Sequence, residues 1–230
     1  LEDRAFLRAI LYTILTCLCL STFGRRGLAP VLMPVNDFIL RYRWQALLLL
    51  GLIATYRMSD TVMGVMANVF YIDQGFTKDQ IASVSKLFGL IMTLVGAGAG
   101  GLLIVRFGIL PILFIGGSAS AATNLLFMLL SGMGTNLQML IFTISADNFS
   151  SGLATAAFVA YLSSLTNLKF SATQYALLSS IMLLLPRLIG GYSGVLVEKF
   201  GYADFFLITA LMGVPTLLLI LVQWRQQGRA

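Results

Sequence analysis

The sequence contains no histidine and few charged residues, and each shortage narrows the possible functions. Only 10% of its 230 residues are charged, whereas 58% are hydrophobic. A soluble domain averages about 25% charged residues, so this composition indicates that lipid is the main solvent of the chain. Without histidine, proton chemistry is left to carboxylates and lysine.

Cysteine is also scarce, because only Cys17 and Cys19 are present, two residues apart in an apolar run. A helix turns such neighbours to different sides, so we interpret both as packing residues rather than a disulfide or a metal site. Neither a catalytic triad nor a metal-ligand cluster can be assembled, which argues against an enzyme and leaves no cofactor to expect. The net charge of +6 is spread between apolar runs rather than along a basic stripe, which argues against a nucleic-acid partner.

Long apolar segments are what the sequence does contain. A transmembrane helix needs about 20 mostly apolar residues. The segments that approximately qualify are 7–24, 44–72, 79–105, 109–131, 137–165, 173–197 and 203–224. The sequence therefore predicts an all-α integral membrane protein with seven spans.

The linker between the first two spans, 26–43, has a different pattern. Pro30 and Pro34 interrupt its backbone. The apolar residues that keep helical spacing within it are Val35, Phe38, Ile39 and Tyr42. We expect a short amphipathic helix at the membrane interface, with Arg41 and Arg43 among the lipid headgroups.

Basic residues in the short loops predict the orientation, since the side richer in them is normally cytoplasmic. The residues on the richer side are Arg25, Arg26, Arg41, Arg43, Arg106, Lys169, Arg225 and Arg229. Those on the other side are Arg4, Arg8, Lys78 and Lys199. The C-terminus is therefore expected in the cytoplasm, with 225–230 as a cytoplasmic tail. Seven spans then place the N-terminus outside, as for a chain cut just before a sixth helix.

Charged side chains also occur inside the predicted spans, where lipid should exclude them. They are Arg57, Asp60, Lys86, Asp147 and Arg187. Each costs about 2.5 to 3.5 kcal/mol at mid-bilayer, so all should face a protein interior or a watery cavity. Three cations and two carboxylates leave a net charge of +1, which suits an anionic solute.

Helical spacing arranges these charges in polar stripes. The first stripe comprises Arg57, Asp60, Gly64, Asn68 and Tyr71. The second comprises Lys86, Gly89, Thr93, Gly96 and Gly100, whose glycines allow close helix approach. Asp147 and Asn148 begin a third polar patch, and Arg187 belongs to a fourth.

Two interpretations of these charges remain open. In the first they are structural ion pairs, Arg57 with Asp60 and Asp147 with Lys86 or Arg187. In the second they line a shared cavity, which charges on four helices favour. The second predicts a carboxylate-bearing solute held by Arg57, Lys86 or Arg187, with Asp60 or Asp147 taking up a coupling proton. The remaining substrate-binding candidates are Asn68, Tyr71 and Asn148.

Several longer motifs make the sequence recognisable. The loop GGLLIVRFGI resembles the loop signature of major facilitator transporters, although Val105 replaces the usual acid and Ile109 the usual base. GGYSGVLVEKFGY is its counterpart three helices later. From about residue 34 to 222 the chain resembles the anhydromuropeptide permeases, the AmpG-type transporters. The motifs are YRMSDTVMGVMANVFYIDQGF, SVSKLFGLIMTLVGAGAGG, SADNFSSGLATAAFVAYLSSLTN and FSATQYALLSS.

This resemblance implies part of a twelve-helix fold of two six-helix bundles, the second bundle plus one preceding helix. Residues 1–25 would be the last helix of the first bundle, 26–43 a cytoplasmic linker and 44–224 the C-terminal bundle. The implied function is proton-driven import of N-acetylglucosaminyl-1,6-anhydromuramyl peptides from periplasm to cytoplasm for cell-wall recycling. The expected partners are this anionic muropeptide, protons, the lipid bilayer of the bacterial inner membrane and the missing N-terminal bundle, without which the chain should not transport.

Other functions compete with this one. A transporter of the same superfamily could instead carry a drug, a sugar or an acyl-CoA. Seven spans could also belong to a receptor or a light-driven pump, against which the loop signatures and the lack of a clear retinal lysine in the seventh span argue. A non-transporting membrane scaffold would have no use for costly intramembrane charges.

Overall fold

The computed structural model describes residues 33–227, which are almost entirely helical and contain no strand. Cys17, Cys19, the predicted span 7–24 and the basic residues before Met33 lie outside the described part. A helix over 33–42 comes first. The helices that follow are α3 (Gln45–Tyr56), α4 (Met58–Asp73), α5 (Lys78–Ser83), η1 (Val84–Gly89), α6 (Leu90–Phe107), α7 (Ile109–Ser131), α8 (Leu137–Leu165), α9 (Ser171–Gly190), α10 (Ser193–Leu211) and α11 (Val214–Gln227).

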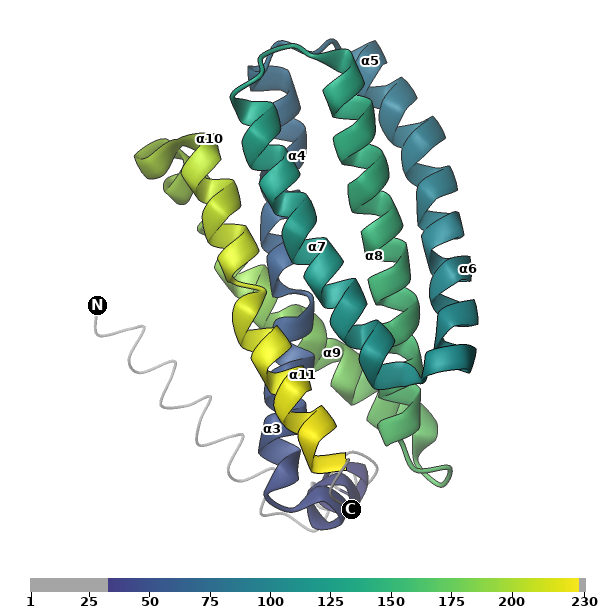
Figure 1. Ribbon diagram of the computed structural model, residues 1–230. Coiled ribbons are helices and arrows are strands. Elements are labelled where there is room, and N and C mark those ends of the chain that lie inside the picture. The colour runs from purple at the N-terminus through teal and green to yellow at the C-terminus, as the bar shows by residue number, and fades with distance from the viewer. Residues whose placement is uncertain (1–32, 228–230) are drawn as a thin grey trace, which may run out of the picture.

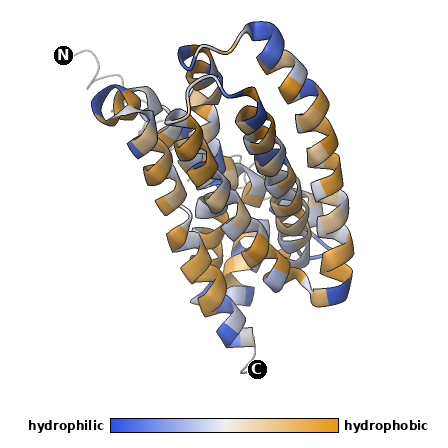
Figure 2. Ribbon diagram, turned by 45° about the horizontal axis from the view of Figure 1, so that its top comes forward, coloured by the Kyte–Doolittle hydropathy of each residue, from blue (hydrophilic) through white to orange (hydrophobic). Residues whose placement is uncertain are grey.

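Most of these helices are long and apolar enough to cross a membrane. The qualifying stretches are Gln45–Asp73, Lys78–Phe107, Ile109–Ser131, Ser171–Gly190 and Ser193–Gln226. Helix α8 is 29 residues long but less apolar, because polar residues such as Asp147 and Asn148 interrupt it. Figure 2 shows hydrophobic residues along the helices and hydrophilic residues gathered toward their ends. The predicted all-α membrane fold is confirmed.

The last of these stretches is not one continuous crossing, because it joins the end of the crossing that α9 begins to the final crossing. Gly201 has φ 80° and ψ 173° inside α10, a conformation that no helix contains. The chain therefore reverses at Gly201, between the predicted spans 173–197 and 203–224. In Figure 1 helix 33–42, the turn from α6 to α7 and the end of α11 lie at one end of the bundle, and α5 lies at the other.

The turn at Gly201 repeats the turn between α6 and α7. Gly108 has φ 88° and ψ 172°, nearly the same values. Each glycine follows a basic residue and a phenylalanine, and the cation lies over that ring, at 5.4 Å for Arg106 and 5.3 Å for Lys199. The two loops that resemble one signature in sequence thus share one geometry, as expected of an internal repeat.

We expect alanine at Gly108 or Gly201 to destabilise the protein by about 1 to 3 kcal/mol, because this backbone region is essentially restricted to glycine. Thermal unfolding in detergent would measure the loss. Gly101→Ala is the matched control, since a Cβ there meets no atom within 4 Å and the backbone needs no positive φ. Equal melting temperatures for Gly108→Ala and Gly101→Ala would contradict this prediction.

Helices α6 and α8 pack with their backbones in contact. A Cβ on Gly96 would lie 2.1 Å from the carbonyl oxygen of Phe149, and one on Gly152 would lie 2.2 Å from that of Thr93. The prediction that the glycines of the second stripe allow close helix approach is confirmed. This contact fixes α8, which carries Asp147 and Asn148, against α6.

The bundle has two apolar clusters with a polar level between them. The cluster nearer helix 33–42 includes Tyr56 and Phe158, whose rings stack at 4.5 Å. The other includes Val62 and Phe70. Within the first crossing, Arg57 and Asp60 lie between Tyr56 of one cluster and Val62 of the other. The two charges therefore lie in the middle of the bundle.

The helices are unequally covered. Only 17% of the most apolar stretch of Lys78–Phe107 and of Ser171–Gly190 is buried, against 44% for Gln45–Asp73. The second crossing and α9 therefore leave more of their surface open than the first crossing does.

Candidate functional site

Arg57 lies at a break in the first membrane crossing. Its backbone, with φ −93° and ψ 8°, ends α3 and precedes α4. The preceding Tyr56 is buried, and its hydroxyl donates to the carbonyl oxygen of Leu113 at 3.1 Å, which fixes the chain at this point. The guanidinium donates to the Thr155 hydroxyl on α8 at 2.9 Å. It also lies 3.6 Å from an oxygen of Asp60, so the predicted ion pair is confirmed, although Arg57 stands at the break before α4 and not inside one helix with Asp60.

Two carboxylates are held by neighbouring hydroxyls of α7. Ser120 donates to the Asp60 oxygen Oδ1, whereas Arg57 lies nearest Oδ2. Thr123, one turn further along α7, donates to Asp147 at 3.0 Å. Helix α7 therefore brings both carboxylates to the level of one guanidinium. We call Arg57, Asp60 and Asp147 the charged trio.

A series of hydrogen bonds between buried polar groups lies next to the trio. Asn124 of α7 donates to the Ser59 hydroxyl at 2.8 Å, and Ser59 donates to the carbonyl oxygen of Thr209 at 2.8 Å. These bonds tie α4 to α7 and α10 next to Asp60. Sequence reasoning missed Ser59, Ser120, Thr123 and Asn124. The available signal for the last three was the segment SASAATN, in which Ser120, Thr123 and Asn124 lie on one face of an apolar span.

The residues of the first predicted stripe face two different sides of the helix. Arg57, Gly64 and Asn68 fall within about 40° on the helical wheel, and all three are exposed or half-buried. Asp60 and Tyr71 lie about 50° round the helix from them, which turns them toward the bundle. Tyr71 is buried, with its ring 6.2 Å from that of Phe127. The structure therefore places Tyr71 in an aromatic core and Asn68 on the open surface.

Asn148 has both ends of its amide occupied by the protein. Its oxygen accepts from the Thr93 hydroxyl at 3.1 Å, and its nitrogen donates to the carbonyl oxygen of Ile144 at 2.8 Å. A Cβ on Gly89 would lie 3.4 Å from the same amide. This side chain joins α6 to α8 in the present structure.

Lys86 and Arg187 stand apart from the trio. Both are exposed, and neither forms an ion pair with any of residues 33–227. The interpretation that Asp147 neutralises Lys86 or Arg187 is therefore wrong, because Asp147 bonds to Thr123 on α7 instead. Lys86 lies in the π-helix η1, a distortion often found at functional sites.

A large cavity of the described chain lies away from these residues. It has a volume of about 1000 Å³ and opens beside helix 33–42, with Tyr42, Gln45, Tyr161 and Gln223 in its lining. None of the predicted site residues lines it. Within residues 33–227, no group of three or more acidic or cysteine side chains is placed to hold a metal ion.

Comparisons with known proteins give this arrangement a context, although no family model matches the chain. A Rickettsia conorii protein named as a transporter, AmpG 4, is 37% identical over 194 residues, 84% of this chain and 46% of its own length. A Rickettsia prowazekii protein named as a transporter, AmpG 1, is 35% identical over 186 residues, 81% of this chain and 42% of its own. The anhydromuropeptide permease of Escherichia coli is 36% identical over 193 residues, 84% of this chain and 39% of its own.

These relatives are named as transporters and permeases, not as enzymes, in agreement with the sequence-based prediction. The chain spans less than half the length of each of them. The described residues form helices, several of them long and apolar enough to cross a membrane, as the sequence predicts. The chain is therefore homologous to part of an AmpG-type transporter.

Proposed function

We propose that this chain is the C-terminal bundle of a proton-coupled permease that imports anhydromuropeptides across the bacterial inner membrane. The observation that carries the proposal is the charged trio, built by α4, α7 and α8 at mid-bundle in a chain whose relatives are permeases. Charged side chains at this depth are energetically costly, and those that occur there usually line a transport pathway. The C-terminus would then lie in the cytoplasm, on the side richer in basic residues.

Substrate carboxylates have suitable partners on the open surface. Lys86 and Arg187 are exposed cations without an ion-pair partner among the described residues, and the Arg57 side chain is 23% exposed. Asn68 adds an exposed amide from α4. A peptide-bearing sugar presents carboxylates to the cations and hydroxyls and amides to groups such as Asn68.

Proton coupling fits the charge count of the trio. One guanidinium and two carboxylates carry −1 when all are ionised. A proton on Asp60 or Asp147 makes the trio neutral, so uptake and release of that proton changes the charge beside the substrate by one. Ser120 and Thr123 are placed to hold either carboxyl in both forms, because a hydroxyl both donates and accepts.

The open surfaces of α6 and α9 would take the other bundle of the same protein. Alternating access needs two bundles moving about a site between them, so this chain alone should not transport. Expression of the chain alone, with an assay of proton-dependent muropeptide uptake, tests the point. Uptake by the chain alone would contradict it.

The substrate is tested by uptake of a radiolabelled anhydromuropeptide into cells that lack other permeases for it and express the transport-competent protein containing this chain. We expect Lys86→Gln and Arg187→Gln to raise the half-saturating concentration, because each removes a cation that faces the substrate. Lys78→Gln, an exposed cation at the first turn of α5, is the matched control.

Competition then separates the candidate solutes. An excess of unlabelled muropeptide should abolish the uptake, whereas a drug, a sugar or an acyl-CoA should leave it unchanged. Unaltered half-saturation in both cation variants would contradict the assigned contacts. Competition by one of the other solutes alone would contradict the substrate itself.

A further inference from the structure

The second crossing contains one turn of π-helix, η1, between α5 and α6. Its buried residues are Val84 and Gly89, which are five residues apart, and the four residues between them are exposed. Hydrogen bonds of a π-helix join residues five apart, so these two residues lie nearly on the same side of the turn. In an α-helix they would lie about 140° apart, and one contact with the bundle would not cover both. The π-helix is therefore what allows both residues to be buried.

The end of η1 at Gly89 is fixed against α8. A Cβ on Gly89 would lie 3.4 Å from the amide of Asn148. The Thr93 hydroxyl lies 2.9 Å from the carbonyl oxygen of Gly89 and 3.1 Å from the amide oxygen of Asn148, so it bridges the two helices. Further along α6, Gly96 brings the backbones of α6 and α8 into contact. These contacts set which side of α6 faces α8, and Gly89 lies on that side.

The start of the segment is also fixed. Thr77 caps α5, because its hydroxyl accepts from the backbone N–H of Gln80 at 3.3 Å and its own N–H donates to the Gln80 side chain at 3.0 Å. Val84 is 4% exposed within an apolar cluster of the bundle. An uninterrupted α-helix would turn Ser85, which lies four residues before Gly89, toward the bundle in place of Val84. Between two fixed ends, the π-helix accommodates one residue more than an α-helix would.

The π-helix determines where Lys86 points. In an α-helix, Lys86 would lie about 60° from Gly89, on the side of α6 that contacts α8. The second predicted stripe placed it on that side. In the structure Lys86 is exposed, and it lines a surface cavity of about 430 Å³ together with Ala82, Ser83 and Leu87. The extra residue in the turn therefore directs the ammonium group away from α8.

We propose that Val84 is a positioning residue for Lys86. Its burial selects the π-helix, and the π-helix presents the Lys86 ammonium to a carboxylate of the substrate instead of turning it toward α8. A buried valine gains packing contacts that stabilise a turn otherwise rare in proteins. This role rests on the proposed function, in which Lys86 contacts the substrate.

Exchange of two neighbouring residues tests the turn without changing the composition. The double variant Val84→Ser with Ser85→Val places its valine four residues before Gly89, so an α-helix buries it and turns Lys86 toward α8. The measurement is the reaction of Lys86→Cys with a water-soluble maleimide, in the purified transport-competent protein with its native cysteines replaced by serine. We expect this reaction to slow in the exchange variant. Met133→Cys, 56% exposed in the turn after α7, should react equally in both backgrounds. An equal rate for Lys86→Cys as well would overturn the proposal.

A deletion tests the turn in a second way, and it decides the question if circular dichroism shows that the exchange variant is unfolded. Without Leu87, Val84 lies four residues before Gly89, so an ordinary α-helix buries both. Lys86 then lies about 160° from Gly89 and still points away from α8. The deletion should therefore preserve the melting temperature and the reactivity of Lys86→Cys. Deletion of Leu94, 65% exposed in α6, should lower the melting temperature, because the glycines of α6 then lose their register on α8. Equal losses in the two deletions would overturn the proposal.

Uptake of radiolabelled anhydromuropeptide tests the role of the turn. We expect the exchange variant to raise the half-saturating concentration about tenfold, as for one lost hydrogen bond to a charged group, with the maximal rate unchanged. Lys86→Gln should add nothing further in that background, because the ammonium group already points away from the substrate. Val84→Ile, which keeps a buried apolar side chain, should retain the native value.

Two outcomes of the uptake measurement have different meanings. A native half-saturating concentration in an exchange variant whose maleimide reaction is slowed would overturn the positioning role of Val84. Absence of muropeptide uptake by the native protein would instead contradict the proposed function, and the maleimide rates would still test the direction of Lys86.

Discussion

Alanine in place of Gly96 is expected to destabilise the bundle by about 3 kcal/mol or more, at the upper end of the range for added core atoms. The new Cβ would lie 2.1 Å from the carbonyl oxygen of Phe149, and that oxygen belongs to the backbone of α8 and has no rotamer by which to move away. Helices α6 and α8 must therefore separate. In a protein of this size, such a loss lowers the melting temperature by about 6 to 12 °C.

Gly98→Ala is a stringent control for this prediction. Gly98 lies in the same helix, two residues further on, and a Cβ there meets no atom within 4 Å. Alanine at that position should leave the melting temperature unchanged or raise it slightly, because alanine favours a helix more than glycine does. Gly152→Ala should behave like Gly96→Ala, since its Cβ would lie 2.2 Å from the carbonyl oxygen of Thr93. Similar stability of the Gly96 and Gly98 variants would contradict the packing of α6 on α8.

The second large effect is expected at the charged trio. Arg57→Gln should both destabilise the protein and abolish proton-driven uptake by the transport-competent protein. Removing one partner of a fully buried ion pair costs about 3 to 5 kcal/mol, and less is expected here because the Arg57 side chain is 23% exposed. The remaining carboxylate of Asp60 would then have only the Ser120 hydroxyl as a partner at this site.

The double variant Arg57→Gln with Asp60→Asn separates the structural from the functional interpretation. Removal of both charges leaves neither unpaired, so stability should return toward that of the native protein. Uptake should remain lost, because the proposed substrate cation and a proton carrier are both gone. Recovery of uptake together with stability would show that the pair is only structural. Asp147→Asn, which keeps its position against Thr123, should retain stability and lose proton dependence.

Local features of the sequence were sufficient for the helices and their turns. The long apolar segments predicted the crossings, since a buried backbone in lipid must satisfy its hydrogen bonds within a helix. The basic residue, phenylalanine and glycine at 106–108 and 199–201 marked equivalent turns, because the backbone there needs glycine. The pairing of Arg57 with Asp60 was also predictable, as it depends only on a spacing of three.

The partners of the other polar residues were decided by tertiary packing. Asp147 contacts Thr123 rather than Lys86 or Arg187, and Tyr71 turns into an aromatic core, because neighbouring helices fix which part of a broad polar face is covered. Asn148 closes on Thr93 only because glycines let α6 and α8 touch. Helical spacing predicts which side of a helix a residue faces, to within about half a turn. It does not predict which residue of another helix packs against that side.

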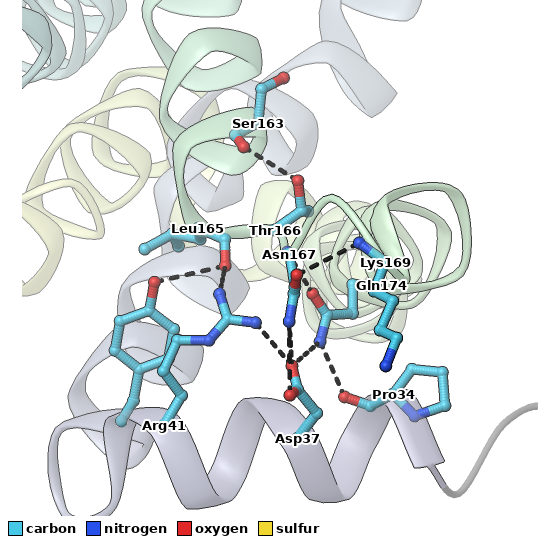
Figure 3. Close-up of polar contacts among 10 residues, drawn as sticks. Pro34, Asp37, Arg41, Ser163, Leu165, Thr166, Asn167, Lys169 and Gln174 are labelled. Atoms are coloured by element: carbon cyan, nitrogen blue, oxygen red, sulfur yellow. Dashed lines mark hydrogen bonds and ion pairs between the residues drawn. The ribbon is translucent and has the colours of Figure 1, made fainter.

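Helix 33–42 shows the same division between sequence and structure. The sequence alone determined an amphipathic helix beside a membrane span. Which of its sides meets the bundle was decided by Gln174, 137 residues away from Asp37, whose amide satisfies the carboxylate and the chain around it (Figure 3). Arg41, which the sequence placed among lipid headgroups, is directed at the bundle and donates to the carbonyl oxygen of Leu165 at 3.1 Å. A half-buried carboxylate such as Asp37 is stabilised by hydrogen-bond donors, and where such donors lie is a property of the folded chain.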